Sequence, residues 1–172
     1  MAHMKKAICI VAAGIIATGA FAVRARSQAK SGSGFEQLKA LIGTWEAATA
    51  AGENPTTSFR AVSNGTAIEE TFNRSRDREM VTIYTPDGNK VALTHYCSMG
   101  NQPRMETAAI ESNAKQFDFA YLGATNLASE ADQHLHHFVL QIIDSDHFLE
   151  TWTILAKGKE TTETFHFVRK KM

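Results

Sequence analysis

The sequence has little cysteine, little proline and no excess of either charge. Its 172 residues include 2 cysteines and 3 prolines, and 18 basic side chains balance 18 acidic ones. Nucleic-acid binding normally requires a basic excess or a basic stripe, so we expect no nucleic-acid partner. The sequence also lacks Walker, GxGxxG, HExxH, GxSxG and CxxC motifs. These absences argue against nucleotide-dependent enzymes, zinc proteases and serine hydrolases, and we predict no catalytic residue.

Long apolar runs are also scarce, and the one at the N-terminus is typical of an export signal. Two lysines precede an apolar stretch at 7–23, and small residues at 20–22 or 27–29 fit the pattern of a cleavage site. An uncleaved membrane anchor is the alternative, although the stretch is short for a span. We expect a signal peptide over 1–29, no stable membrane insertion after its cleavage, and a periplasmic or extracellular protein.

Removal of this signal leaves Cys97 as the only cysteine, so we expect no internal disulfide. Residues 30–34 are rich in Gly and Ser and predict a linker. Apolar residues at 35–42 recur at helical spacing, which predicts a short helix able to plug one mouth of a barrel. The chain from 35 to 172 is long enough for a single domain.

Ten short runs with β character follow, each ended by a turn signal. We predict strands at 43–50, 56–63, 66–73, 79–85, 89–98, 104–111, 115–122, 134–143, 147–155 and 160–169. Strands at this spacing form an antiparallel meander, and ten of them rarely remain open and flat. We therefore expect an all-β fold, a closed antiparallel up-and-down β-barrel of about ten strands with a short N-terminal helix. A barrel of this size has room for a small ligand.

Alternation of side chains along the strands predicts which residues face the interior. In the run at 89–99 the more apolar face carries His95 and Cys97, which are either core residues or a ligand-facing pair. Acids share faces with aromatic residues in later runs, and a buried carboxylate is costly unless it is paired. Arg104 is a candidate partner for such an acid or for a ligand carboxylate. The predicted ligand-binding residues are His95, Cys97, Arg104, Phe119, Glu150 and Trp152.

The segment QHLHHF at 133–138 places His134 and His136 on one face of a predicted strand. Neutral imidazole is a common ligand of zinc, copper and iron, so two histidines at this spacing can reach one metal ion. A zinc site usually needs at least a third protein ligand, for which His95 and Glu106 are the candidates. Solvent-exposed histidines at the start of a strand are the alternative interpretation.

Several segments resemble known families. LKALIGTWEA at 38–47 is similar to the start of calycin-type barrels, in which a short helix leads into a Gly-x-Trp strand, as in lipocalins, fatty-acid-binding proteins and nitrobindin-like haem proteins. LTHYCSMGNQPRM at 93–105, FDF at 117–119 and TETFHFVRK at 162–170 resemble a family of uncharacterised secreted bacterial proteins with a lipocalin-like fold. The resemblance implies a calycin fold and names no activity. Nitrobindin-like proteins bind haem through one barrel histidine.

Three functional hypotheses remain open. The leading one is a barrel that binds a small, largely apolar molecule in its interior, with His95, Arg104 or Glu150 orienting it. The second is a protein, enzymatic or not, that holds a transition metal or haem through His95, Cys97, His134 and His136. The third is a structural or interaction protein with a filled barrel and a binding surface outside.

Overall fold

The computed structural model describes residues 33–48, 52–75 and 78–171, which form a closed antiparallel barrel of ten strands. The strands are β1 Gly43–Ala47, β2 Thr56–Val62, β3 Ala67–Asn73, β4 Glu79–Asp87, β5 Lys90–Tyr96, β6 Gln102–Thr107, β7 Gln116–Thr125, β8 His134–Ile142, β9 His147–Ala156 and β10 Lys159–Arg169. Strands adjacent in the chain are adjacent in the sheet, and β1 pairs with β10 to close it. The predicted fold class is confirmed, and each predicted strand overlaps an observed one.

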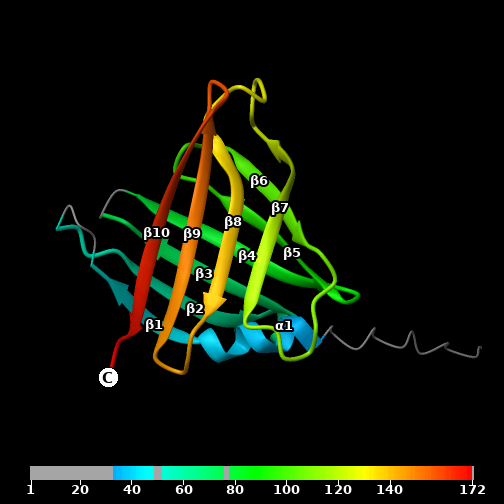
Figure 1. The fold of residues 1–172 in the computed structure, drawn as a ribbon, viewed down its shortest axis with the longest axis vertical. Coiled ribbons are helices and arrows are strands. Elements are labelled where there is room, and N and C mark those ends of the chain that lie inside the picture. Colours follow the sequence, from blue (N-terminus) through cyan, green and yellow to red (C-terminus); the bar gives the residue numbers. More distant parts are fainter. Residues whose placement is uncertain (1–32, 49–51, 76–77, 172) are drawn as a thin grey trace, which may run out of the picture.

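A short helical segment covers one end of the barrel (Figure 1). It consists of helix α1, Ser33–Leu38, and the 3₁₀ helix η1, Lys39–Leu41. It begins two residues before the predicted helix, so the prediction of a linker is wrong for residues 33–34. The predicted signal peptide lies outside the described residues. Within the part of the chain that the structure describes, no helix is long and apolar enough to cross a membrane.

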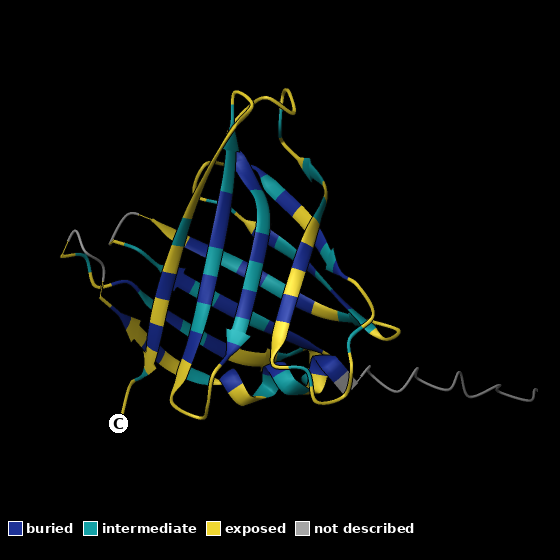
Figure 2. Ribbon diagram, viewed as in Figure 1, coloured by how far each residue is buried: buried dark blue, intermediate teal, exposed yellow. Residues whose placement is uncertain are grey.

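Strands β7 to β10 lie in front of β2 to β5 and cross them at a steep angle in Figure 1. Buried and more exposed positions alternate along most strands, as Figure 2 shows, because successive side chains of a strand point to opposite faces. The core lies between the two layers and continues into α1 and η1, whose Phe35, Leu38 and Leu41 are buried. The helical segment therefore seals its end of the barrel with apolar side chains.

The seam that closes the barrel is short. β1 and β10 share three residue pairs, from Trp45↔Arg169 to Ala47↔Phe167, whereas β9 and β10 share ten. Strand β1 starts two residues before the seam, at Gly43, whose φ of +134° suits glycine. A Cβ atom at this position would lie 2.8 Å from Nη1 of Arg169. The glycine thus allows the arginine side chain to lie against the start of β1.

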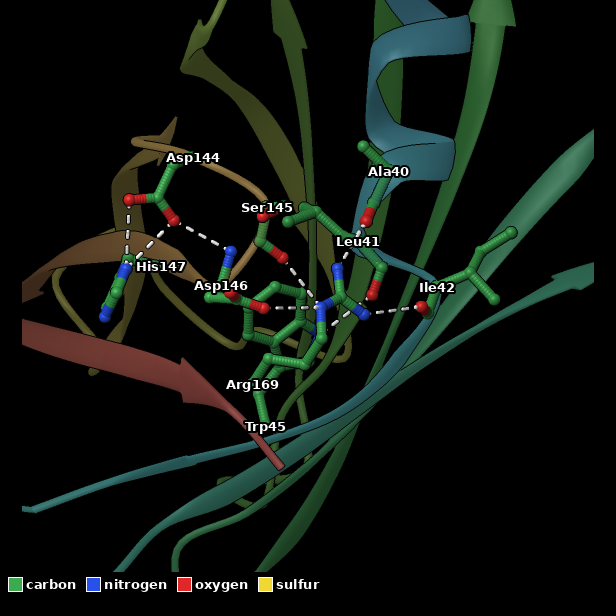
Figure 3. A network of polar contacts seen from close by, with 9 residues as sticks. All are labelled: Ala40, Leu41, Ile42, Trp45, Asp144, Ser145, Asp146, His147 and Arg169. Atoms are coloured by element: carbon green, nitrogen blue, oxygen red, sulfur yellow. Dashed lines mark hydrogen bonds and ion pairs between the residues drawn. The ribbon is translucent and has the colours of Figure 1, made fainter. Parts of the chain in front are cut away.

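Arg169 joins this seam to the helical segment and to the loop between β8 and β9 (Figure 3). Its guanidinium donates hydrogen bonds to the backbone carbonyl groups of Ser145 (2.7 Å), Ile42 (3.0 Å) and Ala40 (2.7 Å). The same group lies 3.9 Å from the centre of the Trp45 ring, a cation–π contact. The Trp45 indole in turn donates to the carbonyl of Leu41 at 2.8 Å. One side chain therefore holds three separate parts of the chain together.

We expect Arg169→Ala to lower the free energy of unfolding by about 2–4 kcal/mol, because it removes a cation–π contact and charge-assisted hydrogen bonds. Chemical denaturation followed by circular dichroism measures the change. Lys170→Ala is the matched control, since it keeps the backbone bond to Thr44 and removes a side chain whose ion pair with Glu46, at 3.7 Å, is exposed; the loss of that pair should cost less than about 0.5 kcal/mol. Equal losses in the two variants would contradict the role assigned to Arg169.

Candidate functional site

The middle of the barrel is packed with side chains, so the space expected for a ligand is filled there. Aromatic rings from opposite walls meet across it, with ring centres 4.8 Å apart for Phe72 and Trp152 and 5.9 Å apart for Tyr84 and Phe119. The space that remains beside His95 is too small to hold a water molecule. A haem, which is far larger, does not fit beside His95 in this packing.

A pocket of about 520 Å³ lies instead at the mouth of the barrel, the end away from α1. Its apolar lining comes from Met80, Cys97, Met99, Trp152 and Ile154, and its charged lining comes from Arg74, Arg78 and Glu163. These residues belong to β4, β9 and β10, to the connection between β3 and β4, and to the connection that follows β5. The mouth pocket therefore combines an apolar floor with a charged rim.

The rim is built around Arg74, which the sequence analysis did not identify. Its guanidinium donates two hydrogen bonds to the carboxylate of Glu163, at 2.6 and 3.0 Å, and a third to Glu53 at 2.9 Å. The bond to Glu163 raises the pKa of Arg74, so the pair remains charged. Arg78 lines the same pocket, is exposed, and forms no ion pair with any residue that the structure describes. The rim thus presents one guanidinium that is not neutralised by those residues.

Arg104 does not face the interior. It is exposed on the outer surface, where it pairs in register with Thr94 and Gly123. The buried residues of β6 are Pro103, Met105 and Thr107. Successive side chains of a strand point to opposite faces, so Arg104 points outward. The prediction that Arg104 meets a buried acid or an internal ligand is therefore wrong.

His95 is buried, as predicted, behind the floor of the mouth pocket. Its Nδ1 lies 2.9 Å from the hydroxyl of Thr82, whereas Nε2 has no hydrogen-bond partner among the residues that the structure describes. Burial lowers the pKa of His95 to about 4, so the ring is neutral at neutral pH. The ring of Trp152 meets that of His95 edge to face at 5.2 Å. Because Trp152 lines both the mouth pocket and the space beside His95, it separates the two.

Cys97 follows two positions later on the same strand face and lines the mouth pocket, where it is half-buried. Burial raises the pKa of its thiol, which is therefore protonated at neutral pH. A protonated thiol is a poor nucleophile. Cys97 contributes to the pocket as a small apolar group.

Glu150 lies inside the barrel and faces a second buried acid, Glu70. The Glu70 carboxylate accepts hydrogen bonds from Tyr84 (2.6 Å) and Thr57 (2.8 Å), and Glu150 accepts one from Trp152 Nε1 (3.0 Å). Burial, and then the nearby charge of Glu70, raise the pKa of Glu150 well above its ordinary value. We therefore assign the shared negative charge to Glu70 and a protonated carboxyl group to Glu150. The protonated carboxyl group of Glu150 then donates a hydrogen bond to the Glu70 carboxylate.

Phe119 is a core residue. It is fully buried and stacks on Phe138 at 5.6 Å, away from the mouth pocket. Among the six predicted ligand-binding residues, the structure thus brings Cys97 and Trp152 to the pocket, places His95 and Glu150 next to Trp152, and leaves Phe119 and Arg104 elsewhere.

His134 and His136 do come together, with Nε2 of the first 3.2 Å from Nδ1 of the second. The predicted third ligands are not there, because His95 lies inside the barrel and Glu106 forms an ion pair with Lys90. Among the described residues, no group of three or more His, Cys, Asp or Glu side chains is placed to hold a metal ion. The hypothesis of a site that joins His95, Cys97, His134 and His136 is therefore wrong.

Glu70, Arg74 and Arg78 are not among the predicted site residues, although Glu70 is recognisable as an acid within a predicted strand. Glu70 shares a face of the predicted strand 66–73 with Ile68 and Phe72, which is the signal that could have placed it inside. Arg74 and Arg78 lie in the connection after that strand, where the sequence has no periodic pattern that predicts which way a side chain points. Comparison with protein-family models gives no match, and comparison with curated proteins gives none either.

We expect Glu150→Gln to change how stability depends on pH. The folded-state pKa of Glu150 is raised above the ordinary 4.5, so the wild-type free energy of unfolding loses up to about 1.4 kcal/mol per pH unit as pH rises from the unfolded to the folded pKa. The variant has no such group, so its stability relative to wild type should increase with pH. Denaturation at several pH values measures this difference.

The lowered pKa of His95 makes stability rise with pH between about 4 and 6.5, which is opposite to the effect of Glu150. Because wild type and Glu150→Gln both contain His95, this contribution cancels in the comparison. Glu69→Gln is the control, because Glu69 lies on the outer face and pairs with Arg60. Its curve should run parallel to the wild-type curve. A parallel curve for Glu150→Gln as well would refute the assigned protonation.

Proposed function

We propose that the protein binds a small, largely apolar molecule with an anionic end in the mouth pocket. The observation that carries the proposal is the pocket itself, about 520 Å³ with an apolar floor and a basic residue at its rim. Ligand pockets of proteins typically measure about 300–1,000 Å³ and combine apolar walls with a few polar groups. The ligand body would lie on Met99, Trp152 and Ile154, and its charged end would meet Arg78.

The groups behind Trp152 support binding at this end. His95 Nε2 is buried without a hydrogen-bond partner among the described residues, and an unsatisfied buried polar atom costs about 1–3 kcal/mol. Displacement of the Trp152 ring would join the mouth pocket to the space beside His95. A polar group of a ligand that entered this far would supply the hydrogen bond that His95 lacks.

The protonation state of the Cys97 thiol favours ligand binding over covalent catalysis. Its thiol is protonated, and its contacts are with Ser98 and Met99 rather than with a base. A cysteine nucleophile requires a thiolate or an adjacent base. The pocket therefore suits reversible binding.

The proposal includes membership of the calycin superfamily and export from the cytoplasm. The helical segment that leads into Gly43-Thr44-Trp45 supports the first, and the apolar N-terminal stretch supports the second. Both fit a carrier or sensor of an apolar metabolite outside the cytoplasm.

Two matched fluorescent probes test the ligand class, the anionic 1-anilinonaphthalene-8-sulfonate and its uncharged analogue N-phenyl-1-naphthylamine. We expect both to bind, and Met99→Glu to weaken both at least tenfold because it places a charge on the apolar floor. Leu122→Glu is the control, since Leu122 is 63% exposed outside the pocket. If the two substitutions act alike, the probes do not occupy the pocket.

The same probes test the rim. Arg78→Ala should weaken the anionic probe about three- to tenfold, which corresponds to about 0.6–1.4 kcal/mol, and leave the uncharged probe unchanged. Arg60→Ala, on the outer face, should affect neither. Equal effects of Arg78→Ala on both probes would contradict an anionic end of the ligand. The proposal would then be limited to an apolar molecule in the mouth pocket.

A further inference from the structure

The two histidines on β8 lie where the barrel wall is irregular. β7 and β8 pair from Gln116↔Gln141 to Ala120↔His137 and not beyond. The register of β8 against β9 also shifts between Leu135 and His137, which leaves His136 as the extra residue of a bulge. Bulges re-aim side chains. Here the result is that the His134 and His136 rings lie 5.3 Å apart, centre to centre.

The hydrogen bonds define the tautomers of these rings. Nδ1 of His134 lies 2.7 Å from the backbone carbonyl of Asp132. Because a carbonyl oxygen only accepts, Nδ1 carries the proton, and Nε2 of the neutral ring has a free lone pair. That lone pair points at Nδ1 of His136, 3.2 Å away.

The separation of these two nitrogens suits a shared metal ion. Two imidazole nitrogens bound to one zinc ion at about 2.0–2.1 Å, with an angle between 90° and tetrahedral, lie about 2.9–3.4 Å apart. The observed 3.2 Å falls within that interval. The ion can therefore take the place of the hydrogen bond once the two rings turn so that both nitrogens face it.

The surroundings hold the first ring and leave the second accessible. His134 is fully buried, and the bond from its Nδ1 to Asp132 is the kind of outer contact that orients metal-binding histidines. Tyr121 packs against both rings, at 4.7 and 5.1 Å. His136 is half-exposed and lines a surface hollow of about 380 Å³, in which water can complete the coordination.

We propose that His134 Nε2 and His136 Nδ1 bind a divalent transition-metal ion of the Zn²⁺ type, with water in the remaining positions. On binding, the proton of His136 Nδ1 moves through solvent to Nε2 of the same ring, so no net proton is released. With two protein ligands the affinity is in the micromolar range, weaker than that of structural sites with four. The site lies outside the mouth pocket and does not depend on the proposed function.

Isothermal titration of the full chain with ZnCl₂ tests this site. We expect one zinc ion per chain in the wild type, and binding at least tenfold weaker in His136→Ala. His147→Ala is the control, because His147 bonds to Asp144 at the opposite end of the barrel, and it should bind as the wild type does. Absence of micromolar binding in the wild type, or unchanged binding in His136→Ala, would overturn the proposal.

A measurement on the wild type alone avoids any folding defect of a variant. Nitrogen-15 spectra of the histidine rings should show a proton on Nδ1 of His134 before zinc is added. Zinc should then shift His134 Nε2 and His136 Nδ1 and leave the nitrogens of His147 and His166 in place. Shifts confined to other histidines would exclude the pair as the site.

Discussion

The structure depends on the contact between Arg169 and Trp45. The seam that closes the barrel has three residue pairs, and so few pairs leave the first and last strands weakly held. The guanidinium covers the Trp45 ring and donates to three backbone carbonyl groups from the helical segment and the β8–β9 loop. A buried or half-buried arginine can do this because its planar fork presents several donors at once while its face stacks on an aromatic ring. The same side chain thus stabilises both the pairing of β1 with β10 and the packing of the helical segment over the end of the barrel.

The closed helical end of the barrel determines where open space remains. Because apolar side chains seal the helical end and aromatic rings fill the middle, open space remains at the mouth, bordered by β4, β9 and β10 and by the connections that follow β3 and β5. Trp152 is the boundary between the packed and the open parts, since it touches Phe72 on one side and lines the mouth pocket on the other. The polar groups that a ligand would need are therefore at the rim or directly behind this one ring.

The interior also carries an electrostatic constraint. Glu70 and Glu150 come from β3 and β9, which face each other across the barrel, and two charged carboxylates cannot remain side by side in a site without water. Hydrogen bonds from Tyr84 and Thr57 stabilise the charge on Glu70, so Glu150 keeps its proton. Such a pair contributes little net stability. It fixes how the two walls of the barrel meet, and it links the packing of Trp152 to pH.

The sequence by itself determined the ten strands, the helix that precedes them and the inward position of His95, Glu150 and Trp152, because period-two alternation and turn residues are local properties of the chain. It was misleading for Arg104, since a charged residue within a strand fits either face until the register is known. Tertiary structure alone decided that the aromatic rings fill the barrel centre, that Arg74 rather than Arg104 meets an acid, and that His134 and His136 point at each other. The first two depend on contacts between residues far apart in the chain, and the third depends on a bulge in β8. Local periodicity encodes neither kind of feature.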